Sequence, residues 1–313
     1  MNVVENEIGH DRRAEIAIVG GGPAGLQAAT VLARTRKRVL VFDSPAPPRN
    51  AASHGIHNFV GVEGLTPQQF RDHAWSQLSQ YDAARPIDCQ VDEVDRTDSG
   101  RFVVSAGADR HEVDHVVLAL GYRDILPEID GFEACWGKTI IPCPFCDGFE
   151  NRDRRWAIVA RSQEELDHFP AMTRNWTEHR VVIASHEVEV TAAHLDTLDG
   201  LGVELYRGEI VEIDQRDGDV RAVTLDDGSI VAVETLLWTP DEAPSPLIAR
   251  LRDTLGLATD DGGHVITDEY QQTNVDRVWA AGDVKGWTGA IESANQGSMA
   301  AAMIVHGWHG AAA

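Results

Sequence analysis

A glycine cluster near the start of the chain constrains the fold more than any other feature. Gly20, Gly22 and Gly25 follow a short apolar run at residues 14–19 and precede a helix-like run at 26–36. In the spacing Gly-x-Gly-x-x-Gly, the first glycine permits a tight turn and the second lets the backbone approach a pyrophosphate. The third glycine packs the helix against the strand. The pattern predicts the strand, turn and helix that open a Rossmann-type α/β domain.

Asp43 completes the expected dinucleotide site. It follows the next apolar run, at 38–42, so its carboxylate can accept a hydrogen bond from a ribose hydroxyl. The first helical residues, including Pro23 and Ala24, are expected to present free backbone amides and a favourable dipole to phosphate. The alternative is a glycine-rich turn that binds nothing, but the strand–helix–strand context favours dinucleotide binding.

The segment after this βαβ unit is expected to add one helix and a small sheet. Thr66-Pro67 is typical of a cap followed by a first-turn proline, which predicts a helix to about residue 81. Alternating apolar residues then predict an antiparallel group of strands, near 87–95, 101–106 and 112–119.

The rest of the chain predicts one domain that is interrupted by another. Residues 121–137 are loop-like, and a second α/β segment runs from about 156 to 238. A strand at 277–280 and a helix at 290–306 end the pattern. We therefore expect an α/β protein with two Rossmann-like, three-layer domains. Residues 1–123 and 244–313 would form an FAD-binding domain, and 124–243 would be the insertion.

A second cofactor signal lies near the end of the chain. Gly282 and Asp283 directly follow the predicted strand at 277–280. The glycine lets the backbone come close to a ligand, and the aspartate can bond a ribityl or pyrophosphate group. This segment resembles the second FAD fingerprint of two-dinucleotide-binding flavoproteins, so the cofactor expected at the first motif is FAD rather than NAD.

The segment at 142–148, Pro-Cys-Pro-Phe-Cys-Asp-Gly, carries the expected chemistry. Cys143 and Cys146 can close a small disulfide, and a helix that began there would lower the pKa of the first thiol. The thiolate is the species that exchanges with disulfides, and Asp147 can serve as a nearby acid or base. Half of a zinc site or a chance pairing are the alternatives, but no second Cys-x-x-Cys supplies further ligands. Cys89 and Cys135 are expected to be buried thiols or bystanders.

Charge and hydropathy exclude two classes of partner. The formal net charge is −23, and phosphate backbones repel such a surface, so nucleic acid is not an expected partner. Whether this charge reflects coding bias or a salt-adapted host stays open. No apolar run reaches about 18 residues, so no membrane span is expected. Residues 1–13 lack the pattern of a signal peptide, so we expect a cytoplasmic protein.

Taken together, the chain resembles the low-molecular-weight thioredoxin reductase family over nearly all of its length. The resemblance rests on the glycine cluster, the dithiol segment and the motifs His57–Gly61, Ala119–Gly121 and Ala281–Asp283. It implies FAD, a homodimer, and flavin contacts that also include Asn58, Gly121 and Ala290. It further implies that Cys146 faces the flavin, that Cys143 is the outer thiol that meets substrate, and that Asp147 transfers protons.

The inserted domain departs from the family at its NADPH motif. After the strand at 156–159, residues 160–166 contain no glycine and include two glutamates, whose side chains would crowd and repel a pyrophosphate. After the strand at 180–183, residues 184–189 lack the arginines that would read the 2′-phosphate. We therefore expect that this domain does not bind NADPH in the usual way.

Two directions of electron flow remain open. In the first, electrons pass from a dithiol through Cys143 and Cys146 to FAD and then to oxygen. That is the activity of the dithiol oxidases of the gliotoxin, holomycin and romidepsin type, which are similar to thioredoxin reductases. The Cys-Pro-Phe-Cys form of the motif in this chain resembles that group. In the second, another donor such as ferredoxin reduces the flavin, and electrons leave to thioredoxin or another disulfide.

Further alternatives also stay open at this point. The protein could be a non-catalytic flavoprotein that acts as a redox sensor or binding partner. The substrate, a small molecule or a thioredoxin-like protein, is not specified by the sequence. His54 and His57 are further candidates for the base, although exposed or simply packed histidines are the plainer interpretation.

Overall fold

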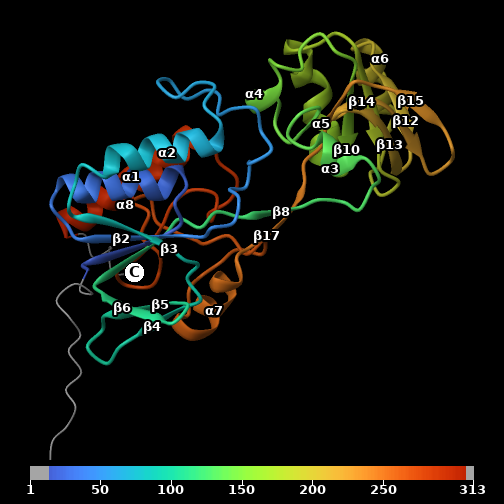
Figure 1. Ribbon diagram of the computed structural model, residues 1–313. Coiled ribbons are helices and arrows are strands. Elements are labelled where there is room, and N and C mark those ends of the chain that lie inside the picture. The colour runs from blue at the N-terminus through green and yellow to red at the C-terminus, as the bar shows by residue number, and fades with distance from the viewer. Residues whose placement is uncertain (1–13, 308–313) are drawn as a thin grey trace, which may run out of the picture. The chain divides into compact units, whose positions relative to one another are not determined.

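The computed structural model describes residues 14–307, which form two compact α/β units (Figure 1). The first unit contains residues 14–49, 68–123 and 242–307. The second contains residues 50–67 and 124–241. The chain therefore crosses between the units several times. Two of the crossing segments, β8 (Arg123–Ile125) and β17 (Asp241–Ala243), pair as a two-stranded sheet.

The core of the first unit is a parallel five-stranded sheet in the order β18-β7-β1-β2-β3. Its strands are β1 (Ile16–Val19), β2 (Val39–Asp43), β3 (Ala84–Asp88), β7 (His115–Leu118) and β18 (Val278–Ala280). The central strands are apolar on both faces, because layers cover the sheet on both sides. The carboxyl ends of all five strands consequently meet at one edge.

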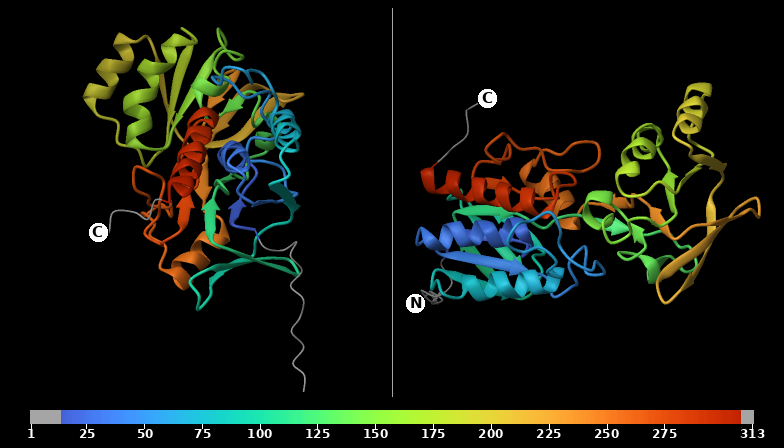
Figure 2. Two further views of the ribbon diagram at one scale, coloured as in Figure 1. Left: turned by 90° about the vertical axis from the view of Figure 1, so that its left-hand side faces the viewer. Right: turned by 90° about the horizontal axis from the view of Figure 1, so that it is seen from above.

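Helices lie on one face of this sheet and a small antiparallel sheet lies on the other (Figure 1). The helical layer contains α1 (Pro23–Arg34), α2 (Pro67–Leu78) and α8 (Ala290–His306). The opposite layer contains α7 (Pro246–Leu255) and the strands β4 (Glu93–Arg96), β5 (Phe102–Ala106) and β6 (Asp109–Val113). Figure 2 shows α1 and α8 side by side in both views.

The second unit repeats the three-layer plan around the sheet β12-β11-β10-β16-β9. These strands are β9 (Ile140–Ile141), β10 (Trp156–Ala160), β11 (Arg180–Ala184), β12 (Glu204–Arg207) and β16 (Thr235–Leu237). Along β10, Ala157 and Val159 pack on one face, while Ile158 and Ala160 pack on the other. The period of two therefore assigns each side chain to one of two separate cores.

Each core of the second unit has its own covering layer. Ile158 and Ala160 lie under α5 (Gln163–Met172) and α6 (Ala192–Gly200). Ala157 and Val159 lie over an antiparallel meander of β13 (Ile210–Arg216), β14 (Asp219–Leu225) and β15 (Ile230–Ala232). The short helices α3 (Phe132–Cys135) and α4 (Pro144–Asp147) and a 3-10 turn at Thr173–Asn175 complete the unit.

The expected fold class is confirmed, with two Rossmann-like α/β domains of three layers each. The predicted antiparallel group was partly wrong. Only β4, β5 and β6 form it, whereas residues 87–88 end β3 and residues 115–118 are β7, and both strands belong to the parallel sheet. Val116, Val117 and Leu118 are fully buried, so their run is continuous rather than alternating.

The segment at 50–67 clusters with the second unit, although the sequence assigned residues 1–123 to one domain. Its side chains explain this placement, since Ser53 and Asn58 hydrogen bond to residues of α4. Such contacts between distant parts of the chain leave no local pattern.

Candidate active site

The first unit gathers most of the predicted cofactor residues at the carboxyl edge of its sheet. Gly20, Gly121 and Gly282 each follow a different parallel strand within a few residues, and Asp43 is the last residue of β2. Pro23, Ala24 and Gly25 begin α1, Asp283 follows Gly282, and Ala290 begins α8. This edge of a parallel sheet is where open α/β domains bind dinucleotides.

The glycine turn has room for a ligand but none for side chains on its inner face. A Cβ on Gly20 would lie 2.1 Å from the carbonyl oxygen of Ala119, and one on Gly25 would lie 1.9 Å from that of Gly20. Gly22, by contrast, has no atom within 4 Å of its Cβ position. It is also the N-cap of α1, and no side chain caps the helix there. The first amides of α1 are thus open to an anion, as FAD binding requires.

Asp43 lies against this turn from the end of β2. Its Oδ1 accepts a hydrogen bond from the amide of Gly21 at 3.2 Å, and its other oxygen pairs with Arg71. A carboxylate oxygen has two lone pairs, so both remain able to accept from ribose hydroxyls. Arg71 on α2 was not predicted from the sequence, because it lies 28 residues further along the chain.

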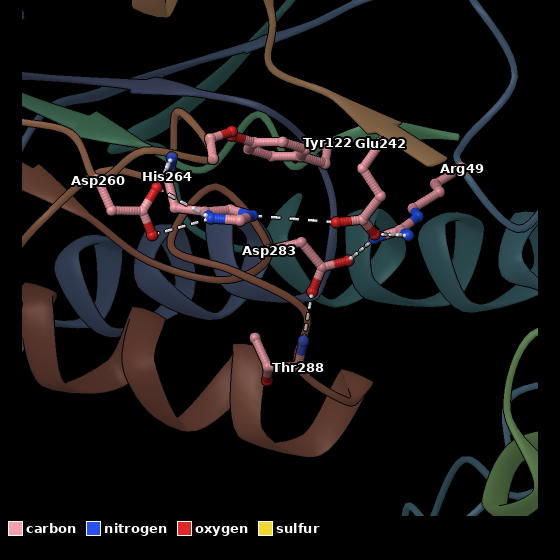
Figure 3. Close-up of polar contacts among 8 residues, drawn as sticks. Arg49, Tyr122, Glu242, Asp260, His264, Asp283 and Thr288 are labelled. Atoms are coloured by element: carbon pink, nitrogen blue, oxygen red, sulfur yellow. Dashed lines mark hydrogen bonds and ion pairs between the residues drawn. The ribbon is translucent and has the colours of Figure 1, made fainter. Parts of the chain in front are cut away.

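Asp283 is held by two donors at the end of β18 (Figure 3). Its Oδ1 accepts from the amide of Thr288 at 3.1 Å, and its Oδ2 accepts from Nη1 of Arg49 at 3.0 Å. Burial raises the pKa of Asp283, and the charge of Arg49 opposes that rise. The pair therefore presents a fixed carboxylate at the predicted second FAD fingerprint.

The dithiol lies in the second unit, where Cys143 is the N-cap residue of α4. Both cysteines are free thiols, with Cys143 buried and Cys146 half-buried. The pKa of Cys143 is lowered mainly by a hydrogen bond from the thiol of Cys146. Burial opposes this effect, and the amides of Cys146 and Phe145 add to it. The expected direction holds, but direct hydrogen bonds supply the cause, since α4 has only four residues.

Asp147 at the end of α4 is buried beside this pair. Burial raises its pKa to about 6, although a hydrogen bond from Ser53 at 3.3 Å opposes the shift. Glu150 raises the pKa further, and His54 and His57 lower it. A carboxyl group that titrates near neutrality can both accept and return a proton.

His57 lies between two carboxylates of the second unit. Its Nδ1 is 2.6 Å from Glu63, and its Nε2 is 3.7 Å from Glu150. Burial opposes the charged form, but these two glutamates and Asp147 raise the pKa of His57 overall. His57 is thus a paired acid–base group rather than an isolated histidine, whereas His54 is exposed.

Asn58 lies beside the dithiol segment of the second unit. Its side-chain amide donates to the carbonyl of Phe145, between the two cysteines in sequence. Its φ of 60° lies in the left-handed region, which asparagine tolerates better than most residues. The predicted contact of Asn58 with FAD stays a prediction.

Glu165 lies in the first turn of α5, the part of a Rossmann-like domain that faces a bound pyrophosphate. This carboxylate accepts from the amides of Arg161 at 2.7 Å and Ser162 at 2.9 Å. The Ser162 hydroxyl in turn accepts from the amide of Glu165, which completes a capping box at the start of α5. The N-terminus of α5 is therefore closed by its own side chains, whereas that of α1 is open.

A second carboxylate fills the position after β11. Glu209 Oε1 accepts from the Ser185 hydroxyl at 2.6 Å and from the amide of His186 at 3.0 Å. The sequence predicted the loss of arginines here but not this replacement, because Glu209 lies 24 residues beyond Ser185. Two internal carboxylates thus occupy donors that could otherwise face the phosphates of a nucleotide.

Across residues 14–307, no three His, Cys, Asp or Glu side chains are grouped so as to hold a metal ion. In the same described span, no helix has the length and apolar character needed to cross a membrane.

Comparison with known proteins agrees with this geometry. The chain belongs to the pyridine nucleotide-disulphide oxidoreductase family, whose model matches residues 14–163 and 174–301. It is 31% identical over 277 residues to thioredoxin reductase tcpT of Claviceps purpurea (strain 20.1), covering 85% of each chain. Together with the uncapped N-terminus of α1 at Gly22, this membership identifies an FAD-binding disulfide oxidoreductase of the thioredoxin reductase-like type.

Two solved structures are similar over almost the whole chain. The crystal structure of HlmI has 32% sequence identity and a TM-score of 0.86, covering 96% of this chain and 94% of that one. The oxidoreductase from Agrobacterium tumefaciens has 29% identity and a TM-score of 0.84, with 94% and 99% coverage. Their shared architecture extends through both units.

Proposed function

We propose that this protein is an FAD-dependent dithiol oxidase that closes a disulfide in its substrate and delivers the electrons to oxygen. The observation that carries the proposal is the closure of the second unit by Glu165 and Glu209. NADPH would have to displace two hydrogen-bonded carboxylates and bring further negative charge against Glu164. Electrons are then best supplied by the dithiol itself.

The reaction begins with the active-site cysteines as a disulfide. A substrate thiolate attacks Cys143 and forms a mixed disulfide, and the S–S bond breaks to release the Cys146 thiolate. The second substrate thiol displaces Cys143, so the substrate leaves as a disulfide and the enzyme keeps two electrons as a dithiol. FAD, which the turn at Gly20–Gly25 and the carboxylates of Asp43 and Asp283 would hold, would supply the acceptor for these two electrons and their route to oxygen, which would leave with two protons as hydrogen peroxide.

The chain's own groups move the protons and hold the sulfur. Asp147 takes a proton from a substrate thiol, because its raised pKa of about 6 suits transfer near neutral pH. His57, paired with Glu63, is a second group that can share this proton within the same unit. The backbone amides of Cys146 and Phe145 stabilise the Cys143 thiolate when it is displaced.

The deciding experiment is an anaerobic titration of the purified holoprotein followed by flavin absorbance. A dithiol such as dithiothreitol is expected to bleach the flavin, and air is expected to restore it with release of one peroxide per flavin. NADPH is expected to leave the spectrum unchanged. Fast bleaching by NADPH would contradict the proposal. Bleaching by reduced ferredoxin alone would instead favour a thioredoxin reductase-like enzyme with another donor.

Matched cysteine variants test the role of the pair. Cys146→Ser is expected to retain FAD but to lose dithiol turnover, whereas Cys89→Ser, a free cysteine of the first unit, is expected to keep both. A flavin that ignores dithiols and reductants even in the wild-type protein would point to a sensor or binding protein.

We further propose, from the resemblance to thioredoxin reductases, that the enzyme is a cytoplasmic homodimer. Light scattering of the purified holoprotein tests the dimer, since a monomer at micromolar concentration would contradict it. Activity with a small dithiol but not with reduced thioredoxin would identify a small molecule as the substrate.

A further inference from the structure

The side chain of Arg49 lies between two carboxylates of the first unit (Figure 3). Nη1 donates to Asp283 at 3.0 Å, and Nη2 pairs with Glu242. Only 14% of the Arg49 side chain is exposed. A planar guanidinium can serve two carboxylates at once, whereas a lysine ammonium is a single point charge. The Arg49 guanidinium therefore bridges Asp283 and Glu242.

These three residues come from distant parts of the chain. Arg49 is the last residue before the chain leaves the first unit, and Glu242 is the first residue after its final return. Asp283 follows β18 at the carboxyl edge of the sheet. The neighbouring Gly282 is close to α1 there, because a Cβ added to Gly282 would lie 3.1 Å from the Cβ of Ala24. One side chain thus connects both crossing points to the cofactor edge.

Glu242 has a second neighbour, His264, besides Arg49. His264 Nε2 lies 3.9 Å from Glu242, and its Nδ1 lies 3.0 Å from Asp260. The Tyr122 ring stacks on His264 with centroids 4.6 Å apart and donates its hydroxyl to the carbonyl of Gly262. Glu242 therefore pairs with Arg49 and has His264 as a further neighbour.

Removal of Arg49 would leave Asp283 as a buried carboxylate with one amide partner. Such a group turns towards water or takes up a proton, because an unpaired buried charge is costly. Either change would withdraw the acceptor that the second fingerprint presents to FAD.

We propose that Arg49 is a positioning residue for FAD, which orients Asp283 and, through Glu242, couples FAD occupancy to the order of the two crossing segments. This inference depends on FAD binding and not on the direction of electron flow. It predicts that the protein without FAD has looser crossings at 44–50 and 240–244 than the holoprotein.

The test measures FAD affinity of the apoprotein by fluorescence, together with hydrogen exchange at both crossings. Arg49→Gln is expected to weaken FAD binding roughly 10- to 100-fold, and Arg49→Lys roughly 3- to 10-fold, as expected for loss of a buried charge-assisted pair. FAD is expected to slow exchange at both crossings in the wild-type protein but not in Arg49→Gln. Arg123→Gln removes an exposed arginine at another crossing and is the control for net charge.

FAD affinity of Arg49→Gln within twofold of wild type would overturn the proposal, and so would an equal loss in Arg123→Gln. If Arg49→Gln does not fold, Arg49→Lys decides. A folded Arg49→Lys variant with unchanged affinity for FAD and unchanged hydrogen exchange at the crossings would refute the bridging role of Arg49.

Discussion

Glu165 closes the helix that it belongs to, because its carboxylate accepts from the amide of Ser162 at 2.9 Å. The N-cap position, which is Ser162 at α5, is Gly22 at α1, where no side chain caps the helix. Two helix N-termini that start from equivalent βα turns thus differ in whether an internal anion is already present. This difference separates the half that binds a dinucleotide from the half for which we propose that it does not.

Glu165→Gln is expected to weaken the cap without opening a nucleotide site. The amide side chain still fills the space but accepts fewer hydrogen bonds, so unfolding should become easier by about 1 kcal/mol, the usual value of an N-terminal cap. Urea unfolding measures the change. Glu164→Gln, an exposed neighbour, is the control and should change stability by no more than about 0.5 kcal/mol. NADPH should bleach neither variant, and bleaching of either would contradict the proposed closure.

Cys146→Ala is expected to raise the pKa of Cys143. The thiol of Cys146 is the main donor that stabilises the Cys143 thiolate, and alanine cannot replace it. Thiolate absorbance near 240 nm, followed against pH in the reduced protein, should therefore rise at higher pH than in wild type. Cys135→Ala provides the comparison, since burial raises the pKa of Cys135 and its removal should leave the early titration intact. An unchanged midpoint in Cys146→Ala would contradict the assigned donor.

Asp147→Asn should abolish proton transfer at this position and should make the protein more stable, relative to wild type, as the pH rises. Burial raises the pKa of Asp147 to about 6 in the folded protein, so folding favours its protonated form. Wild-type stability from this group is present at low pH and is lost as the pH rises through about 6. From acidic to alkaline pH, the free energy of unfolding of the asparagine variant should therefore rise relative to that of wild type by about 2–3 kcal/mol.

Denaturant unfolding at pH 4 and pH 8 measures this shift, and Asp98→Asn, an exposed loop substitution, should show none of it. The same Asp147→Asn protein should lose most dithiol turnover near neutral pH while it retains FAD. A stability difference that does not depend on pH would mean that Asp147 is ionised as easily in the folded as in the unfolded chain.

Gly297→Ala should disrupt the packing that supports the FAD motif. A Cβ at Gly297 on α8 would lie 2.0 Å from the carbonyl oxygen of Ala24 on α1. The two helices would have to separate at the start of α1, at a cost of about 1–3 kcal/mol. Thermal unfolding and the flavin content of the purified protein measure the effect. Gly200→Ala, where nothing lies within 4 Å, should keep its FAD and change stability by less than about 1 kcal/mol.

Local spacing explains which parts of the structure could be predicted. The strand, glycine turn and helix of the first unit follow from residues 14–36, because each element forms from neighbours in sequence. Cys143 and Cys146 were found in the same way, since a separation of three residues places both at one short helix. The continuous apolar run at 116–118 was misassigned because burial on both faces removes the alternation of apolar and polar residues that marks a strand with one face exposed.

By itself, then, the sequence determined the α/β class, the FAD motifs, the dithiol and the absence of the usual NADPH glycines. Only the tertiary structure showed that Glu209 accepts from the amide of His186, that Ser53 contacts Asp147, and that Arg49 joins Asp283 across 234 positions. Helix turns and tight loops can be predicted because they depend on residues that are neighbours in the sequence. Buried charges are paired by partners from any part of the chain, because Coulomb energy in a dry interior depends on distance in space and not along the sequence.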